Sequence, residues 1–180
     1  MSGLITRRHV LGLAAAGSAV LAAGGVGLAL RGSVLREPRR ALRVLDPVGF
    51  SVVAAAADVF CPATETLPSG WDLFVPEKVD DLLAAQLPGA GEELRQALLL
   101  LENALVGAVL DARPRPFTAC DPAVRLEVLR AWQRSAIPLR RTVYKALRGL
   151  CSAPYWADPV VWEHVGYPGP PRYAALGGGQ

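Results

Sequence analysis

The feature that most constrains the fold of this chain is an aspartate followed directly by a proline. The motif occurs three times, as Asp46-Pro47, Asp121-Pro122 and Asp158-Pro159. An aspartate before a helix can accept hydrogen bonds from the unpaired amides of the first turn, and the fixed φ of proline suits the first helical position. The motif therefore predicts helix starts in widely separated parts of the chain.

Apolar residues recur at helical spacing in further segments, and we expect helices over about 76–87, 91–112 and 138–150. In 91–112 apolar residues lie on both sides of the helix, which predicts one long, central and buried helix. In 138–150 the pattern predicts a buried Leu139 and an exposed Arg140. No stretch shows the sustained alternation of a strand, so the expected fold is an all-α, compact helical bundle.

The N-terminus resembles a targeting segment. Arg7 and Arg8 directly precede an Ala- and Gly-rich apolar stretch that begins at Leu11 and runs to Leu30. Twin arginines before a weakly hydrophobic stretch are a receptor-read address for export. We interpret residues 1–30 as a twin-arginine signal, cleaved or kept as an anchor helix, and expect the twin-arginine translocase to read Arg7, Arg8 and Leu11. An ordinary membrane anchor is the alternative, because about twenty apolar residues can span a bilayer.

Charge separates a basic N-terminal part from a mildly acidic body. Residues 31–45 form an arginine-rich linker, whereas residues 46–180 carry a net charge of −3. The basic pI therefore belongs to the targeting end, which argues against nucleic-acid binding by the folded domain. We expect the helical domain to span residues 46–171 and a disordered tail to follow over 172–180.

Residue types that carry catalysis are sparse and scattered. His9 falls within the signal, and His164 stands alone without a second histidine or a cysteine at metal-ligand spacing. Cys61, Cys120 and Cys151 are isolated, which is compatible with one disulfide and a free thiol or with three buried thiols. We therefore expect no catalytic residue, no metal site and no bound cofactor in this chain.

Aromatic residues and prolines gather near the C-terminus. Aromatic side chains beside rigid prolines form contact surfaces at a low cost in conformational entropy. This pattern predicts a partner-binding surface, with self-packing over the bundle as the alternative. The predicted surface comprises Tyr155, Trp162, Tyr167, Pro168, Gly169 and Pro170.

Several of these features occur together in one known family. They are the twin-arginine leader, Ala57-Asp58-Val59-Phe60-Cys61-Pro62, Val79-Asp80, the helix of Arg125, Tyr155 through Asp158-Pro159, and Gly166-Tyr167-Pro168-Gly169-Pro170 after Trp162. On these motifs the chain resembles the gluconate 2-dehydrogenase subunit 3 family, with the most specific likeness in the Gly-Tyr-Pro-Gly-Pro segment. The resemblance covers most of residues 46–171.

The resemblance implies a non-catalytic small subunit of a membrane-associated dehydrogenase of sugars or alcohols. The large subunit of such a complex is an FAD-containing glucose–methanol–choline oxidoreductase without a signal of its own, and a cytochrome c subunit often completes the complex. The small subunit would supply the export signal and help the large subunit to fold and assemble. FAD is expected in the partner, and the complex is expected in the periplasm or on the periplasmic face of the inner membrane.

Two other functions stay open on the sequence. The chain could be a single-pass anchored protein that acts alone in a redox or structural role. It could also be a membrane protein with a cytoplasmic domain, which is favoured by the five arginines between Arg31 and Arg43. Positive residues next to a membrane span tend to stay on the cytoplasmic side.

Overall fold

The structure is a computed structural model that describes residues 32–85 and 90–170. Over these residues it contains seven α-helices, one short 3-10 helix and no strand, which confirms the all-α prediction. The elements are α3 (Pro47–Phe60), α4 (Val75–Ala84), α5 (Ala90–Glu102), α6 (Ala104–Asp111), η2 (Phe117–Ala119), α7 (Pro122–Gln133), α8 (Pro138–Trp156) and α9 (Pro159–Val165). No helix of the described part has the length and hydrophobicity needed to cross a bilayer.

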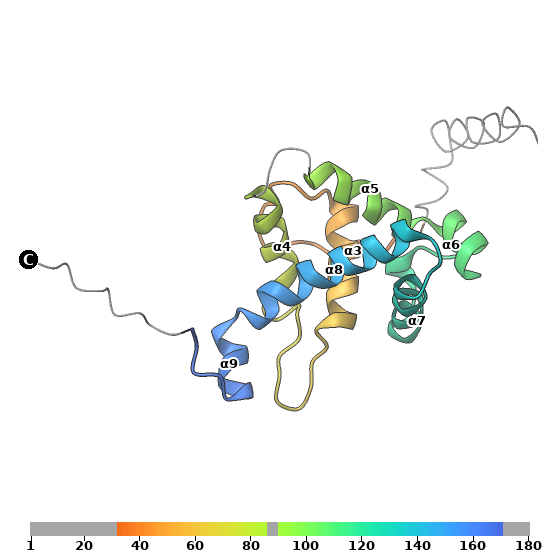
Figure 1. Ribbon diagram of the computed structural model, residues 1–180. Helices are drawn as coiled ribbons and strands as arrows, with labels where there is room; N and C mark the ends of the chain where they lie inside the picture. Colours follow the sequence, from red (N-terminus) through yellow and green to blue (C-terminus); the bar gives the residue numbers. More distant parts are fainter. Residues whose placement is uncertain (1–31, 86–89, 171–180) are drawn as a thin grey trace, which may run out of the picture.

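Helix α3 is the central element of the bundle. The Asp46 carboxylate accepts a hydrogen bond of 2.6 Å from the amide of Gly49, and Pro47 occupies the first turn, as the sequence predicts. All residues from Gly49 to Ala57 are buried. Helices α4, α5, α7 and α8 pack around α3, and α8 crosses it (Figure 1). Small side chains such as those of the alanine run in α3 allow this close packing.

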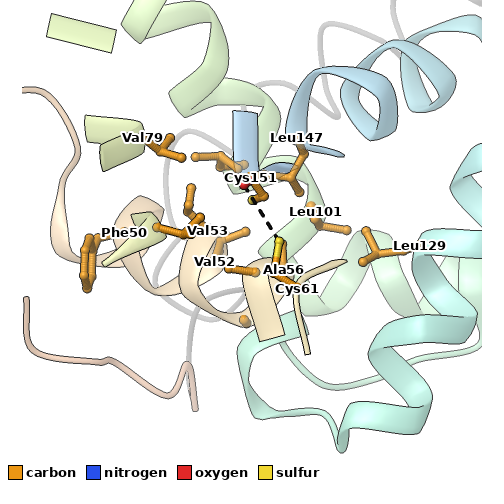
Figure 2. Packing of buried hydrophobic residues seen from close by; sticks show 14 of the residues in the cluster. Phe50, Val52, Val53, Ala56, Cys61, Val79, Leu101, Leu129, Leu147 and Cys151 are labelled. Atoms are coloured by element: carbon orange, nitrogen blue, oxygen red, sulfur yellow. Dashed lines mark hydrogen bonds between the residues drawn. The ribbon is translucent and has the colours of Figure 1, made fainter. Parts of the chain in front are cut away.

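The hydrophobic core lies where α3 meets α8 and continues toward α5 and α7. Figure 2 shows side chains from these four helices in one continuous cluster, including Val53, Leu101, Leu129 and Leu147. Trp132 of α7 is also fully buried, with an exposed fraction of 1%. Burial of large apolar side chains is the main source of stability in a bundle of this kind.

The predicted helix starts at the Asp-Pro pairs are all present, but the three aspartates differ in what they do. Asp158 accepts a hydrogen bond of 3.0 Å from the amide of Val160. The side chain of Asp121 makes no capping hydrogen bond, so only its backbone carbonyl, which accepts from Arg125 at 3.0 Å, belongs to the start of α7. Proline at the first position is sufficient there to set the start.

The prediction of one long buried helix over 91–112 was wrong, because the segment forms two helices. Asn103 adopts an extended conformation between α5 and α6, and its Oδ1 accepts hydrogen bonds from the amides of Leu105 and Val106. An asparagine side chain can replace the backbone as the acceptor for these amides, which starts a new helix. The second helix, α6, lies at the edge of the bundle rather than at its centre (Figure 1).

The helix predicted over 138–150 continues to Trp156. In its first turn the buried and exposed residues differ from those predicted. Leu139 is 55% exposed, whereas Arg140 is only 8% exposed. Arg140 is buried because it donates to the carboxylate of Asp111 and lies over the ring of Trp132, with its Cζ 4.9 Å from the ring centroid. An apolar pattern alone does not reveal that an arginine has such partners.

Residues 32–45, which we call the strap, pack along the bundle. The backbone amide of Val34 donates to Thr118 Oγ1 at 2.9 Å, and the guanidinium of Arg36 pairs with Asp58. Asp80 of α4 accepts three backbone hydrogen bonds from the end of the strap, from Arg43, Val44 and Leu45. The segment that the sequence indicates as a linker is therefore held by the folded domain along its described length.

Candidate functional site

The C-terminal end of the bundle is a corner between α8 and α9, and a partly buried ion pair fixes this corner to α4. Lys78 Nζ lies 2.5 Å from Asp158 Oδ2, and the same aspartate caps α9. Burial acts to raise the pKa of Asp158, but the hydrogen bonds from Lys78 and from the Val160 amide outweigh it, so the pKa lies below its usual range. The carboxylate is therefore ionised at neutral pH and holds α9 in place.

The residues after α9 fold back onto Trp162. Its Nε1 donates to the carbonyl of Trp156 at 2.7 Å, and its ring meets that of Tyr167 edge to face at 5.5 Å between centroids. Gly166 and Gly169 have φ values of +69° and +93°, which favour glycine. A Cβ on Gly169 would also lie 3.2 Å from the Trp162 ring. The glycines of the Gly-Tyr-Pro-Gly-Pro segment thus allow the chain to pack on this tryptophan.

Four apolar side chains stay exposed at this corner. We call the set the aromatic corner: Trp156, Val160, Val165 and Tyr167. Trp156 and Tyr167 expose about half of their surfaces although both rings are held by aromatic neighbours, Tyr155 and Trp162. Rigid exposed aromatic rings are typical anchors of protein interfaces, because little entropy is lost when they are covered.

The structure divides the residues predicted for this surface into two groups. Tyr155 is buried, and its hydroxyl donates to the carbonyl of Pro68 at 2.9 Å, so it supports the corner from inside. Burial also raises its pKa. Pro168 and Pro170 are exposed next to Tyr167, and Trp162 and Gly169 are half-buried. Whether this surface binds a partner stays a prediction.

Sequence reasoning missed three residues of the corner: Trp156, Val160 and Val165. For Val160 and Val165 the signal is the length of α9, which has only seven residues, whereas Trp156 is the last residue of α8. Such a short helix at the end of a bundle can bury one stripe, here Val161, and leaves the other apolar side chains outside.

The titratable groups of the corner do not form a set for acid–base or metal chemistry. His164 Nδ1 lies 2.7 Å from the carbonyl of Val160 in its own helix. Within residues 32–85 and 90–170, no group of three His, Cys, Asp or Glu side chains is arranged to hold a metal ion. The arrangement presents exposed apolar side chains on a rigid support, which is typical of surfaces that contact other molecules.

A comparison with models of protein families shows which family the chain belongs to. The family model described as Gluconate 2-dehydrogenase subunit 3 matches residues 49–169. The chain belongs to the gluconate 2-dehydrogenase subunit 3 family. Members of this family are subunits of a dehydrogenase complex, so the chain has other subunits of that complex as partners. Comparison with curated proteins and with solved structures found no match.

The region that identifies this gluconate 2-dehydrogenase subunit 3 protein begins in α3 and ends at Gly169, so it includes the aromatic corner. The strap precedes it. The predicted signal residues, Arg7, Arg8 and Leu11, and the predicted tail over 172–180 lie outside the described residues. Their roles therefore stay predictions.

The cysteines of this family member are buried free thiols. Burial raises the pKa of Cys61 to about 11 and that of Cys151 further, and Cys61 Sγ lies 3.8 Å from the Cys151 carbonyl (Figure 2). Thiolate is the reactive form, so alkylation of Cys61 by iodoacetamide at pH 8 is expected to be about 100-fold slower in the native protein than in urea. Mass spectrometry of time points measures both rates. Equal rates would contradict the burial of this thiol.

Proposed function

We propose that the chain is a non-catalytic small subunit of an FAD-dependent dehydrogenase of sugars or alcohols. In this role it carries the twin-arginine signal for the large flavin subunit and supports its folding and assembly. The observation that carries the proposal is the family match, which extends over the whole bundle from α3 to Gly169. The large subunit holds the FAD, binds the substrate and passes electrons to a cytochrome c subunit.

The twin arginines support the export part of the proposal. Arg7 and Arg8 stand before a weakly hydrophobic stretch, and this arrangement is read by a route that carries folded proteins. A small subunit with such a signal can export a partner that has folded on it in the cytoplasm. The working place of the complex is then the periplasm or the periplasmic face of the inner membrane.

The strap links the signal to the folded state of the body. Its hydrogen bonds reach three different parts of the bundle, through Thr118, Asp58 and Asp80. These contacts exist only when α3, α4 and the η2 segment are in place, so the chain directly after the signal is ordered by the folded domain. This coupling suits a subunit whose signal serves an assembled complex.

Changing Arg7 and Arg8 together to lysine is expected to leave both this chain and the dehydrogenase activity in the cytoplasm. The translocase receptor reads the arginine pair itself, so a change that conserves charge is sufficient. The measurement is dye-linked dehydrogenase activity in periplasmic, membrane and cytoplasmic fractions of cells that express the complex.

The matched control is Arg130→Lys with Arg134→Lys, which makes the same change at two exposed positions of the body and should leave export unchanged. If the dehydrogenase reaches the periplasm with Arg7→Lys and Arg8→Lys, the chain does not supply the signal for its partner. Protease protection of the body from the periplasmic side would instead favour a membrane protein with a cytoplasmic domain.

A further inference from the structure

A groove of about 400 Å³ lies along α8, next to the end of α7. We call it the α8 groove. Helices α7 and α8 pack against each other (Figure 1), and Gln133 of α7 lines one side of the groove. The rest of its lining comes from one stripe of α8: Tyr144, Lys145, Arg148, Gly149, Ser152 and Trp156. These residues span about three helical turns, so the groove is elongated.

The α8 groove is lined by two cations and by no carboxylate. Lys145 and Arg148 are exposed and one helical turn apart, and neither forms an ion pair within the described residues. Helix α8 itself contains no aspartate or glutamate, and Glu127 of α7 lines a different hollow, next to α6. Two like charges at this spacing repel each other. The groove therefore favours an anion that lies between the two side chains.

The neutral polar side chains of the α8 groove are also without partners in the chain. Gln133, Tyr144 and Ser152 make no side-chain hydrogen bond to another residue of 32–85 or 90–170. All three can donate to a ligand, as Lys145 and Arg148 can. A carboxylate offers two oxygens in one plane, whereas a phosphate group offers four oxygens in a tetrahedron. Donors that reach a ligand from two helices suit a phosphate group better.

Gly149 lies in the middle of α8 and lines the groove between the polar residues. A Cβ added at this position would have no atom of the chain within 4 Å. Glycine within an exposed helix is less stable than alanine, and no contact within the described bundle requires it here. A ligand that approaches the backbone of α8 closely at this point would require it.

The α8 groove ends at the aromatic corner. Trp156 belongs to both, is 52% exposed, and is held by Tyr155 at 5.3 Å between ring centroids. It lies about 12 Å along the helix from Arg148. Tryptophan and tyrosine beside apolar residues are typical of the membrane–water interface. Exposed apolar side chains continue beyond Trp156, at Val160, Val165 and Tyr167.

We propose that the α8 groove binds the phosphate group of a phospholipid, with the acyl part of the lipid against Trp156 and the aromatic corner. Lys145 and Arg148 bind the phosphate oxygens. Gln133 and Ser152 donate to other oxygens of the headgroup. A soluble phosphate ester would match the cations but would leave the adjoining apolar side chains in water. The site is formed by this chain alone, so the inference does not depend on the proposed function.

The test is calorimetric titration of the full chain with dihexanoyl phosphatidylglycerol, kept below its micelle concentration. The reference ligand is glycerophosphoglycerol, which is the same headgroup without acyl chains. The lipid is expected to bind at least about 10-fold more tightly than the headgroup, because its apolar part is buried against the aromatic corner. Absence of lipid binding by the wild-type chain at about 1 mM would overturn the proposal.

Arg148→Gln is expected to weaken lipid binding about 10-fold, because it removes a hydrogen bond between a charged donor and the phosphate. The matched control is Arg115→Gln, which makes the same change at an exposed arginine outside the groove and should keep the wild-type affinity. Equal losses for the two variants would overturn the site, since they would show a general attraction by net charge.

Gly149→Ala separates binding from stability. It is expected to raise the melting temperature by about 3 °C, because alanine favours the helix. It should also weaken lipid binding at least about 5-fold, because the added methyl group occupies space that the headgroup fills. A higher melting temperature with unchanged affinity would overturn the close approach of the headgroup to the backbone.

Two further results identify another ligand. If glycerophosphoglycerol binds as tightly as the lipid and Arg148→Gln weakens both, the ligand is a soluble phosphate ester and the lipid assignment is wrong. If a glutamate-rich peptide binds more tightly than the lipid, the α8 groove binds an acidic protein and the proposal is overturned.

Discussion

Asp80→Ala is expected to lower the free energy of unfolding by about 3 to 4 kcal/mol, because it leaves buried backbone donors without an acceptor. Asp80 is fully buried, and its two carboxylate oxygens accept the amides of Arg43, Val44 and Leu45 at 2.7 to 2.9 Å. These amides belong to the end of the strap, directly before α3. The change should therefore release the strap as well as destabilise the bundle. Urea unfolding followed by circular dichroism measures the loss.

The adjacent carboxylate provides the matched control. Asp81 is on the same helix, but its side chain is 44% exposed, and among the described residues it forms ion pairs with Arg40 and Arg43. Exposed ion pairs contribute little, so Asp81→Ala should reduce the free energy of unfolding by less than about 1 kcal/mol. Equal losses for the two variants would show that Asp80 does not hold the strap through its backbone.

Arg140→Met is expected to destabilise the bundle by about 3 to 5 kcal/mol, because it leaves a buried carboxylate without its charge partner. The side chains of Arg140 and Asp111 are 9% and 5% exposed. Asp111 also accepts from Trp132 Nε1 at 3.2 Å, so the unpaired carboxylate stays tied to the core. The change should loosen the C-terminal end of α6. Thermal and urea unfolding measure the overall loss, and hydrogen exchange of α6 amides locates it.

Two variants show whether the effect belongs to the ion pair. Arg141→Met, at the next position, removes a hydrogen bond to the Ser135 carbonyl and should lower the free energy of unfolding by about 1 kcal/mol. Combining Arg140→Met with Asp111→Leu removes both charges and should recover most of the stability. A double variant as unstable as Arg140→Met alone would contradict the assignment.

The helical fold was predictable because its signals are local. Asp46-Pro47 and Asp158-Pro159 begin helices as predicted, with the capping hydrogen bonds that the motif indicates. The break at Asn103 was not predicted, since one polar residue within an apolar pattern does not show that its side chain caps a new helix. Arg140 was placed on the exposed face for a similar reason. Its partner Asp111 is on another helix, and no pattern within 138–150 indicates it.

The strap also depends on distant residues. The sequence predicts an arginine-rich linker here, whereas in the structure Arg36 pairs with Asp58 and Arg39 lies over Trp71, with its Cζ 4.6 Å from the ring centroid. These contacts join residues more than twenty positions apart. Composition gives the charge of such a segment, but it does not identify the carboxylates and aromatic rings that its arginines contact.

The candidate surfaces were predicted in part. The C-terminal aromatic segment was recognised from its composition, and the structure adds that Tyr155 supports it from inside while Trp156 and Tyr167 face outward. The exposure of α6 could not be predicted, because apolar residues on both sides of a helix predict burial in the bundle.

The most direct test of the account is recovery of the full chain through a C-terminal tag after expression with its genomic neighbours, from gently solubilised membrane and periplasmic fractions. A flavin spectrum and mass spectrometry of the bound proteins are recorded together. The account predicts a stoichiometric FAD-containing partner of the glucose–methanol–choline class in the eluate. Recovery of this chain alone and colourless from both fractions would contradict it.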